Sequence, residues 1–295
     1  MRLREPGLLQ GAIDLHLHSA PDCIPRYDHC VAIAREAAEA GFRAIVFKDH
    51  FSPSVVKAEL TQSLVPEIRV FGGVALNNLT GGLNPRTVAW ALRTGARVIM
   101  MPTMDSLFMA SYGSRSMHYQ MFQFGYRQPP IPVLEEGGRT LRPEAEDILR
   151  LVAEADAVLA TGHLGQGEAL ALCRRARELG VRRMMVTHPN HYYPFEFTLE
   201  GLKELTSLGA YLNLSFGACH PYYGRHDPRE VAEIVRHVGP ERCNLITDFG
   251  QLESPAPAEG MRVFCEILMK CGFDREAIDQ MVKVNPARLL GLEEL

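Results

Sequence analysis

The sequence predicts a (β/α)8 barrel, and three observations favour this fold class. Short apolar runs rich in β-branched residues recur along the chain, a segment able to form a helix follows each run, and glycine often stands between a helix and the next run. Eight such units in about 280 residues match the number and size of the units in this barrel. The predicted strands are 12–18, 43–47, 68–77, 97–101, 157–163, 182–187, 211–215 and 243–247.

Side chains suited to helix ends mark the predicted helices. Gly41, just before the second strand, can take the left-handed conformation that ends a helix. A capping residue before a first-turn proline predicts helix starts at Asn84, Asp227 and Asn285. An open, doubly wound sheet is the alternative fold. Because no Gly-x-Gly-x-x-Gly turn follows the first predicted strand, the barrel is favoured.

Composition and charge argue against several classes of protein. Of 295 residues, 46% are hydrophobic and 22% charged, as in globular domains, and the net charge is −4. Without a dense run of Lys and Arg, binding to nucleic acid or to an anionic membrane is not expected. No stretch approaches the roughly 20 apolar residues of a membrane helix or has the apolar core of a signal peptide. Seven cysteines without a Cys-x-x-Cys spacing are typical of reduced thiols, and we expect a cytoplasmic protein.

The segment 105–142, after the fourth predicted strand, is too long for a simple connection. Its aromatic residues argue against disorder, so we expect one barrel domain over 1–295 with 105–142 as a substrate-covering insertion. Packing against a neighbouring subunit in a homo-oligomer is the alternative. Arg115, Arg127 and Arg139 in this segment are candidates for binding a phosphate or carboxylate of a small-molecule substrate. His191, after the sixth strand, is a further candidate substrate contact.

The first predicted strand carries a possible metal-binding pair. Side chains on a strand alternate between its faces, so Asp14, His16 and His18 share one face. Two imidazoles at positions i and i+2 can reach one cation. Further candidate ligands end later strands: His163 the fifth and His188 the sixth.

Asp248 follows the eighth strand, and such strand ends converge on the catalytic face of a barrel. Histidines with a carboxylate suit zinc, manganese or iron. Alternation also places Lys48 and His50, at the end of the second strand, on one face. Lys48 could become a metal ligand by carboxylation, or bind an anionic substrate as a cation. His50 is expected to be a metal ligand or a substrate contact.

These positions carry a resemblance to a known family. The chain resembles the amidohydrolase superfamily of metal-dependent hydrolases in its candidate ligands His16, His18, His163, His188 and Asp248. The ending over residues 285–292, Asn-Pro-Ala-Arg-Leu-Leu-Gly-Leu, is similar to the close of many of those barrels. The resemblance extends over nearly the whole chain.

The resemblance implies a metal centre and a mechanism. His16, His18 and Asp248 would hold a first divalent ion, and His163 and His188 a second. Asp248 would also take a proton from the attacking water and pass it to the leaving group, so Asp248 and His188 are the expected catalytic residues. The ions would be zinc first, with manganese or iron as alternatives. A second ion about 3.5–4 Å from the first would polarise the bond under attack.

Two features depart from the superfamily pattern. The fourth strand ends Met-Met-Pro-Thr over 100–103, without the Lys or Glu that bridges two metals in many members, so either Lys48 replaces the bridge or the site holds one ion. The second strand, ending Lys48-Asp49-His50, instead resembles the polymerase and histidinol phosphatase (PHP) phosphoesterases. The Glu expected there on the third strand is absent from 72–77.

Taken together, the sequence predicts a metal-dependent hydrolase that uses metal-activated water on an amide, lactam or lactone bond of a small molecule. A PHP-like phosphoesterase is the main alternative. A decarboxylase, or a barrel that binds metal and a ligand without turnover, stays open because fold and ligands do not fix the reaction.

Overall fold

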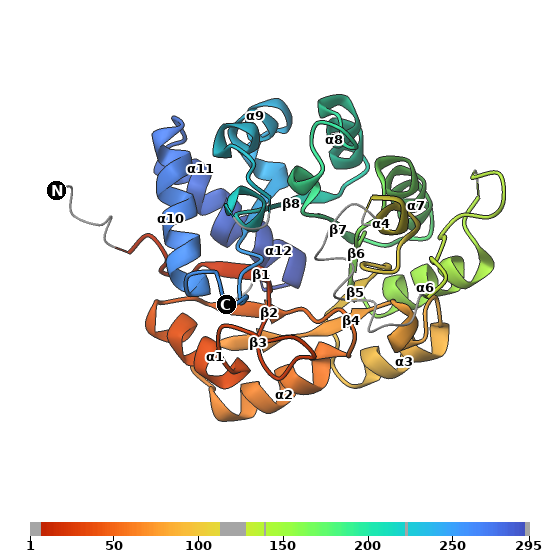
Figure 1. Cartoon of the computed structure of the whole chain (residues 1–295), viewed down its shortest axis with the longest axis horizontal. Helices are drawn as coiled ribbons and strands as arrows, with labels where there is room; N and C mark the ends of the chain where they lie inside the picture. The colour runs from red at the N-terminus through yellow and green to blue at the C-terminus, as the bar shows by residue number, and fades with distance from the viewer. Residues whose placement is uncertain (1–6, 113–127, 139, 222–223, 293–295) are drawn as a thin grey trace. The chain divides into compact units, whose positions relative to one another are not determined.

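The protein alternates parallel strands with helices along the chain (Figure 1). The structure is a computed structural model that describes residues 7–112, 128–138, 140–221 and 224–292. Within these ranges the strands are β1 (Ile13–Leu17), β2 (Ala44–Phe47), β3 (Arg69–Phe71), β4 (Gly73–Ala75), β5 (Val98–Met100), β6 (Val158–Ala160), β7 (Arg183–Thr187), β8 (Tyr211–Ser215) and β9 (Cys243–Ile246).

Helices connect these strands. They are α1 (Cys30–Glu39), α2 (Ser54–Leu64), α3 (Pro85–Arg93), α4 (Leu107–Tyr112), α6 (Pro143–Glu154), α7 (Gln166–Glu178), α8 (Leu199–Ser207), α9 (Pro228–Val238), α10 (Pro257–Lys270), α11 (Arg275–Asp279) and α12 (Asn285–Leu290). Among the described residues, no helix combines the length and the apolar character that crossing a membrane requires.

The strands pair in chain order. One sheet has the order β1-β2-β3 and the other the order β4-β5-β6-β7-β8-β9. The registers of β1 to β3 and of β4 to β7 are parallel. Parallel strands need crossover connections, and the intervening helices provide them. This repeated βα unit confirms the predicted (β/α)8 class.

The third predicted strand, 68–77, is one element in the prediction and two in the structure. Gly72 separates β3, which pairs with β2, from β4, which pairs with β5. A Cβ at Gly72 would lie 2.6 Å from the Ser54 carbonyl oxygen, so glycine lets the chain pass close to α2. The pattern of apolar residues continues across Gly72, so the sequence pattern did not predict that the strand divides there.

Two compact units are distinguished within the chain. The first comprises residues 1–47, 57–71 and 213–295, and the second residues 48–56 and 72–212. In the first unit, buried residues of β1, β2 and β9 such as Ile13, Ile45 and Leu245 form the core with α10 and α12. In the second unit, β4 to β7 carry buried residues such as Val74 and Ile99, and α6 packs on α3 and α7. A single domain over 1–295 stays a prediction.

Two of the three predicted helix starts are confirmed. The side chain of Asn84 accepts a hydrogen bond from the Arg86 N–H (2.9 Å), and that of Asp227 from the Arg229 N–H (2.8 Å). The third was wrong, because α12 continues directly from a π-helical turn over 280–284, so Asn285 is not a cap. The buried Asn285 amide instead donates to the Pro240 and Cys243 carbonyls at 2.8 and 2.7 Å.

Candidate metal centre

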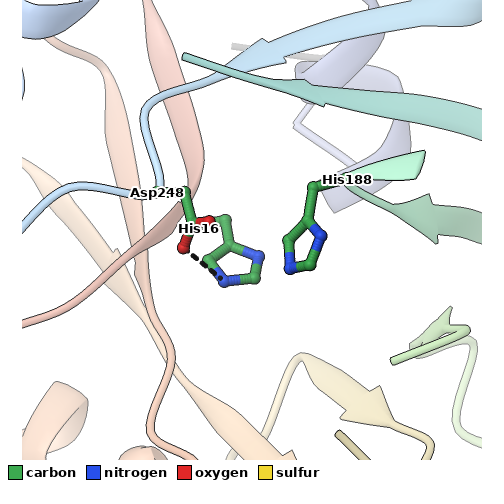
Figure 2. Close-up of side chains that lie close together, drawn as sticks. All are labelled: His16, His188 and Asp248. Atoms are coloured by element: carbon green, nitrogen blue, oxygen red, sulfur yellow. Dashed lines mark ion pairs between the residues drawn. The ribbon is translucent and has the colours of Figure 1, made fainter. Parts of the chain in front are cut away.

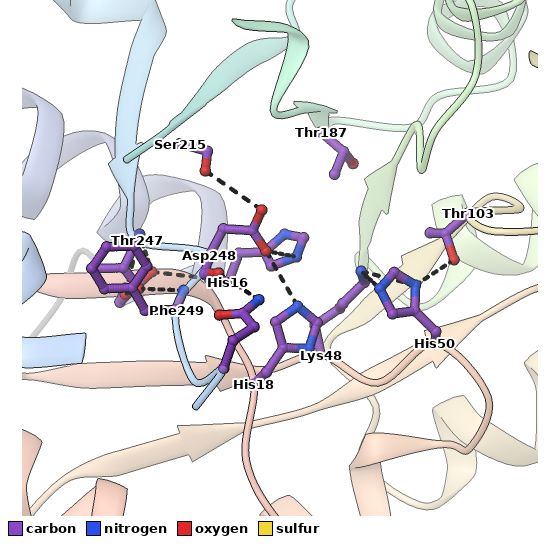
Figure 3. Close-up of polar contacts among 12 residues, drawn as sticks. His16, His18, Lys48, His50, Thr103, Thr187, Ser215, Thr247, Asp248 and Phe249 are labelled. Carbon is purple, nitrogen blue, oxygen red and sulfur yellow. Dashed lines mark hydrogen bonds and ion pairs between the residues drawn. The ribbon is translucent and has the colours of Figure 1, made fainter. Parts of the chain in front are cut away.

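Two histidines and a carboxylate converge in the first unit. Strand β1 carries His16 and His18, which are 0% and 2% exposed. His16 Nε2 lies 3.3 Å from Oδ1 of Asp248 (Figures 2 and 3). His18 Nε2 lies 3.2 Å from the same oxygen (Figure 3). Ligands about 2.0–2.1 Å from a tetrahedral zinc ion are about 3.3–3.4 Å apart. The spacing and the donor types therefore fit a divalent metal ion.

Asp248 has an unusual backbone conformation. It follows β9 at φ +56°, in the left-handed region that few residues other than glycine, Asn and Asp adopt. Its N–H donates to the His16 carbonyl (3.0 Å), and its own carbonyl accepts from Gln251 Nε2 (3.0 Å). Strain of this kind collects at functional sites and persists where the surroundings fix it.

The chain leaves Asp248 by passing very close to β1. His18 N–H donates to the Phe249 carbonyl (2.7 Å), and Gly250 follows at φ +119°. A Cβ at Gly250 would lie 2.0 Å from the His18 carbonyl oxygen, so only glycine fits here.

Behind these residues lies the buried carboxylate of Asp14. It accepts hydrogen bonds from the Thr247 hydroxyl (2.5 Å), from the Thr247 N–H (3.3 Å) and from the His16 N–H (3.1 Å). Burial raises the pKa of the Asp14 carboxyl to about 7, although these hydrogen bonds oppose the shift.

Strand β8 adds a polar group to the centre in the first unit. The Ser215 hydroxyl lies 3.5 Å from Oδ2, the other carboxylate oxygen of Asp248 (Figure 3). A Cβ at Gly217 would lie 3.3 Å from the Asp248 Cβ, so a small residue is favoured beside the carboxylate.

The second unit brings Lys48 and His50 together, as strand alternation predicted. Lys48 Nζ lies 2.9 Å from His50 Nε2, and His50 Nδ1 lies 2.9 Å from the Thr103 hydroxyl (Figure 3). Asn77 fixes this arrangement: its amide nitrogen donates to the His50 carbonyl (2.6 Å) and to Thr103 Oγ1 (2.7 Å). Its amide oxygen accepts the N–H groups of Thr103 and Asp105, at 2.9 and 3.1 Å.

Three further histidines extend this row in the second unit. The His163 ring centroid lies 5.5 Å from that of His50 and 4.8 Å from that of His188. His188 follows β7 at φ +30°, and its ring lies 4.6 Å from His191, the candidate substrate contact. The hydroxyl of Thr187 accepts the Gly162 N–H (3.1 Å), which links the strand ends that carry His163 and His188.

Part of the predicted insertion packs beside these histidines. Helix α4 lies at the start of this insertion and ends at Tyr112, which stacks on Phe195 with the ring centroids 5.4 Å apart. Phe108 of the same helix meets Tyr192 edge to face at 5.0 Å. Tyr192 in turn lies 6.0 Å from the His188 ring. The candidate arginines Arg115, Arg127 and Arg139 lie outside the described residues.

No role was predicted from the sequence for Asp14, Asn77, Thr247 or Ser215. For Asp14, one signal existed, since it shares the strand face of His16 and His18. For the others, the signal is a polar residue at a strand end, which is too common to select them without the contacts.

Solved structures with a similar fold are known. Similar structures include an amidohydrolase from Pseudomonas aeruginosa, at TM-score 0.61 and 9% identity, covering 96% of each chain. An N-acetyl-D-glucosamine-6-phosphate deacetylase from Mycobacterium smegmatis matches at TM-score 0.58 and 17% identity, over 96% of this chain and 76% of that one. A mutant organophosphorus hydrolase from Deinococcus radiodurans matches at 0.58 and 14%, over 96% and 94%. The chain therefore has the fold of these hydrolases.

A protein family is also assigned. Residues 11–213 match the model described as Family of unknown function (DUF6282), and the chain belongs to this family. The matched region includes the candidate ligands from His16 to His188 but ends before Asp248. A search of curated proteins found no match.

Proposed function

We propose that the protein is a metal-dependent hydrolase that uses a metal-activated water to cleave an amide, lactam or lactone bond of a small molecule. The observation that carries the proposal is the convergence of His16 Nε2 and His18 Nε2 on one oxygen of Asp248, at 3.3 and 3.2 Å. The fold shared with an amidohydrolase and a deacetylase supports the same class of reaction.

In this proposal the first unit supplies the ligands of a first ion, His16, His18 and Asp248. The second unit supplies His163 and His188 for a second ion, with Lys48 and His50 completing its surroundings. Zinc is the first choice because imidazole and carboxylate are common zinc ligands, with manganese and iron as alternatives. A divalent ion supplies Lewis acidity and lowers the pKa of water.

Asp248 is the proposed general base. One oxygen, Oδ1, faces the two imidazoles, while Oδ2 lies near Ser215. The Asp248 side chain is 13% exposed, so water can reach it. It takes a proton from the attacking water and returns it to the leaving group. His191 would contact the substrate beside the aromatic side chains of Tyr192 and Phe195.

Lys48 has two possible uses, which an experiment separates. Carboxylated, it would be an anionic metal ligand; as an ammonium group, it would bind a substrate anion. Protein exchanged with ¹³C-bicarbonate is expected to show a carbamate signal in carbon NMR only in the first case. Lys48→Arg, which keeps the cation, should lose that signal.

The test of the metal centre is elemental analysis of chelator-stripped protein reloaded with zinc or manganese. We expect His16→Ala to lose the first ion and His163→Ala to lose only the second, so that His163→Ala keeps one equivalent fewer than the parent protein. His29→Ala, at an exposed histidine outside the centre, is the matched control and should retain the full content. Parent protein that holds no tight metal would overturn the proposal.

Active preparations are then screened on amides, lactams, lactones and phosphoesters. Turnover of an amide, lactam or lactone that needs the added metal supports the proposed bond class. Turnover confined to phosphoesters would replace it with the PHP-like alternative.

A further inference from the structure

The Asp14 network consists of the Asp14 carboxylate, Thr247, and the main-chain groups of His16 and Phe249. Asp14 receives three kinds of donor: the Thr247 hydroxyl, the Thr247 N–H and the His16 N–H. The same Thr247 hydroxyl oxygen accepts the Phe249 N–H at 3.2 Å. Asp14 and Thr247 are 0% and 0% exposed, so water does not compete for these bonds.

The network acts on both sides of the strained residue. Thr247 immediately precedes Asp248 and Phe249 immediately follows it, and both are fixed through the one hydroxyl group. On the other strand, the Asp14 carboxylate holds the N–H of His16, whose carbonyl accepts the Asp248 N–H. The backbone of His16 and the φ +56° conformation of Asp248 are therefore set by common partners.

We propose that Asp14 and Thr247 are positioning residues of the metal centre, which hold His16 and Asp248 at the separation that a divalent ion requires. The inference rests on the proposed metal centre and deepens it, because it assigns the control of metal affinity to two residues that contact no ion themselves. All the contacts that carry it lie in the first unit.

Both distances between Asp248 and the histidines depend on the position of the Asp248 backbone. Donor atoms 3.2–3.3 Å apart suit one ion, and a shift of the Asp248 backbone would change both of its distances to the histidines together. Outer-shell partners of metal ligands typically change metal affinity by about 10–100-fold when they are removed. We expect loss of the Thr247 hydroxyl to fall in this range.

The test compares three variants by metal affinity rather than by activity alone. Thr247→Val removes the hydroxyl at nearly constant size, Thr247→Ser keeps it, and Asp14→Asn keeps the shape of Asp14 while exchanging one acceptor for a donor. Dissociation constants for Zn²⁺ come from competition with a chromophoric chelator. The visible spectrum of Co²⁺-loaded protein reports the coordination geometry.

Thr61→Val is the matched control. Thr61 is also 0% exposed and in the first unit, and its hydroxyl donates at 2.8 Å to the carbonyl of Lys57, which is not a candidate ligand. We expect Thr247→Val to weaken Zn²⁺ binding about 10–100-fold and to alter the Co²⁺ spectrum. Thr247→Ser should bind Zn²⁺ within about threefold of the parent affinity and show the parent's Co²⁺ spectrum. Thr61→Val should change neither the affinity nor the spectrum.

Three results would decide against the inference. Thr247→Val with the parent's affinity and spectrum would show that the hydroxyl does not position the ligands. An equal loss of affinity in Thr61→Val would show that the effect is general destabilisation. If Thr247→Val fails to fold, Asp14→Asn takes its place, and unchanged Zn²⁺ binding in that variant overturns the inference. Absence of metal binding in the parent protein is a different result, because it overturns the proposed function itself.

Discussion

Asp14 in the first unit and Asn77 in the second have nearly the same shape, and both are 0% exposed behind a candidate site. Asp14 links β1 to the segment after β9, whereas Asn77 links the end of β2 to the segment after β5. Every hydrogen bond recorded for the Asp14 side chain is accepted by it. Asn77 accepts two N–H groups and donates twice, to the His50 carbonyl and to Thr103.

The partners explain why one residue is an acid and the other an amide. A position surrounded by donors is served by a group with acceptors only, even though burial raises the pKa of Asp14 to about 7. A position that faces both carbonyls and N–H groups needs an amide, because a carboxylate would leave two acceptors in contact. The first unit therefore keeps an additional acidic group beside its candidate ligands, whereas in the second unit the His50 carbonyl is held by the neutral amide of Asn77.

The largest expected effect is on activity, and it comes from replacing the proposed general base of the first unit. Asp248→Asn keeps the size of the side chain and tolerates φ +56°, so the fold should be retained. We expect kcat/KM on an identified substrate to fall by about 10³-fold or more, because the proton acceptor is lost. Steady-state kinetics and circular dichroism measure the two quantities.

His50→Gln in the second unit is the partner of that experiment. Its loss of activity should be smaller, since His50 is not the proton acceptor in the proposal. Equal losses for the two variants, or an active Asp248→Asn protein with unchanged metal content, would remove Asp248 from its assigned role.

The next largest effect is on stability, and it comes from replacing the Asn77 amide by an acid. Asn77→Asp places a carboxylate oxygen in the position that donates to the His50 carbonyl, now 2.6 Å away. Because a buried polar group left without its partner costs about 1–3 kcal/mol, we expect the free energy of unfolding to fall by that amount. Urea denaturation followed by circular dichroism gives the value.

Asn84→Asp makes the same one-atom change at the N-cap of α3, where Asn and Asp are about equally favourable. It should leave the free energy of unfolding nearly unchanged. If both variants behave alike, the donor role assigned to Asn77 is incorrect.

The difference between these networks also shows what the sequence could reveal. Strand ends were predictable because alternating apolar residues and glycines are local signals, and they located His16, His18, His163, His188 and Asp248 within three residues of a strand. The role of Asp14 could not be predicted, because its partner Thr247 is 233 residues away along the chain. The prediction that Asn285 caps a helix was wrong for a related reason. Its amide donates to carbonyls more than 40 residues away and not to its own helix.

The smallest effect concerns Ser215, which approaches Asp248 from β8 rather than through the Asp14 network. At 3.5 Å, its hydroxyl is at the outer limit of a hydrogen bond to Oδ2, and such a bond contributes about 1 kcal/mol or less. We therefore expect Ser215→Ala to change kcat/KM by less than about fivefold and to leave Zn²⁺ affinity at the parent value. A loss of a hundredfold in either quantity would mean that β8, and not the network behind β1 and β9, holds the carboxylate in place. The Asp14 network would then have a structural role only, and its contrast with Asn77 would concern stability rather than metal binding.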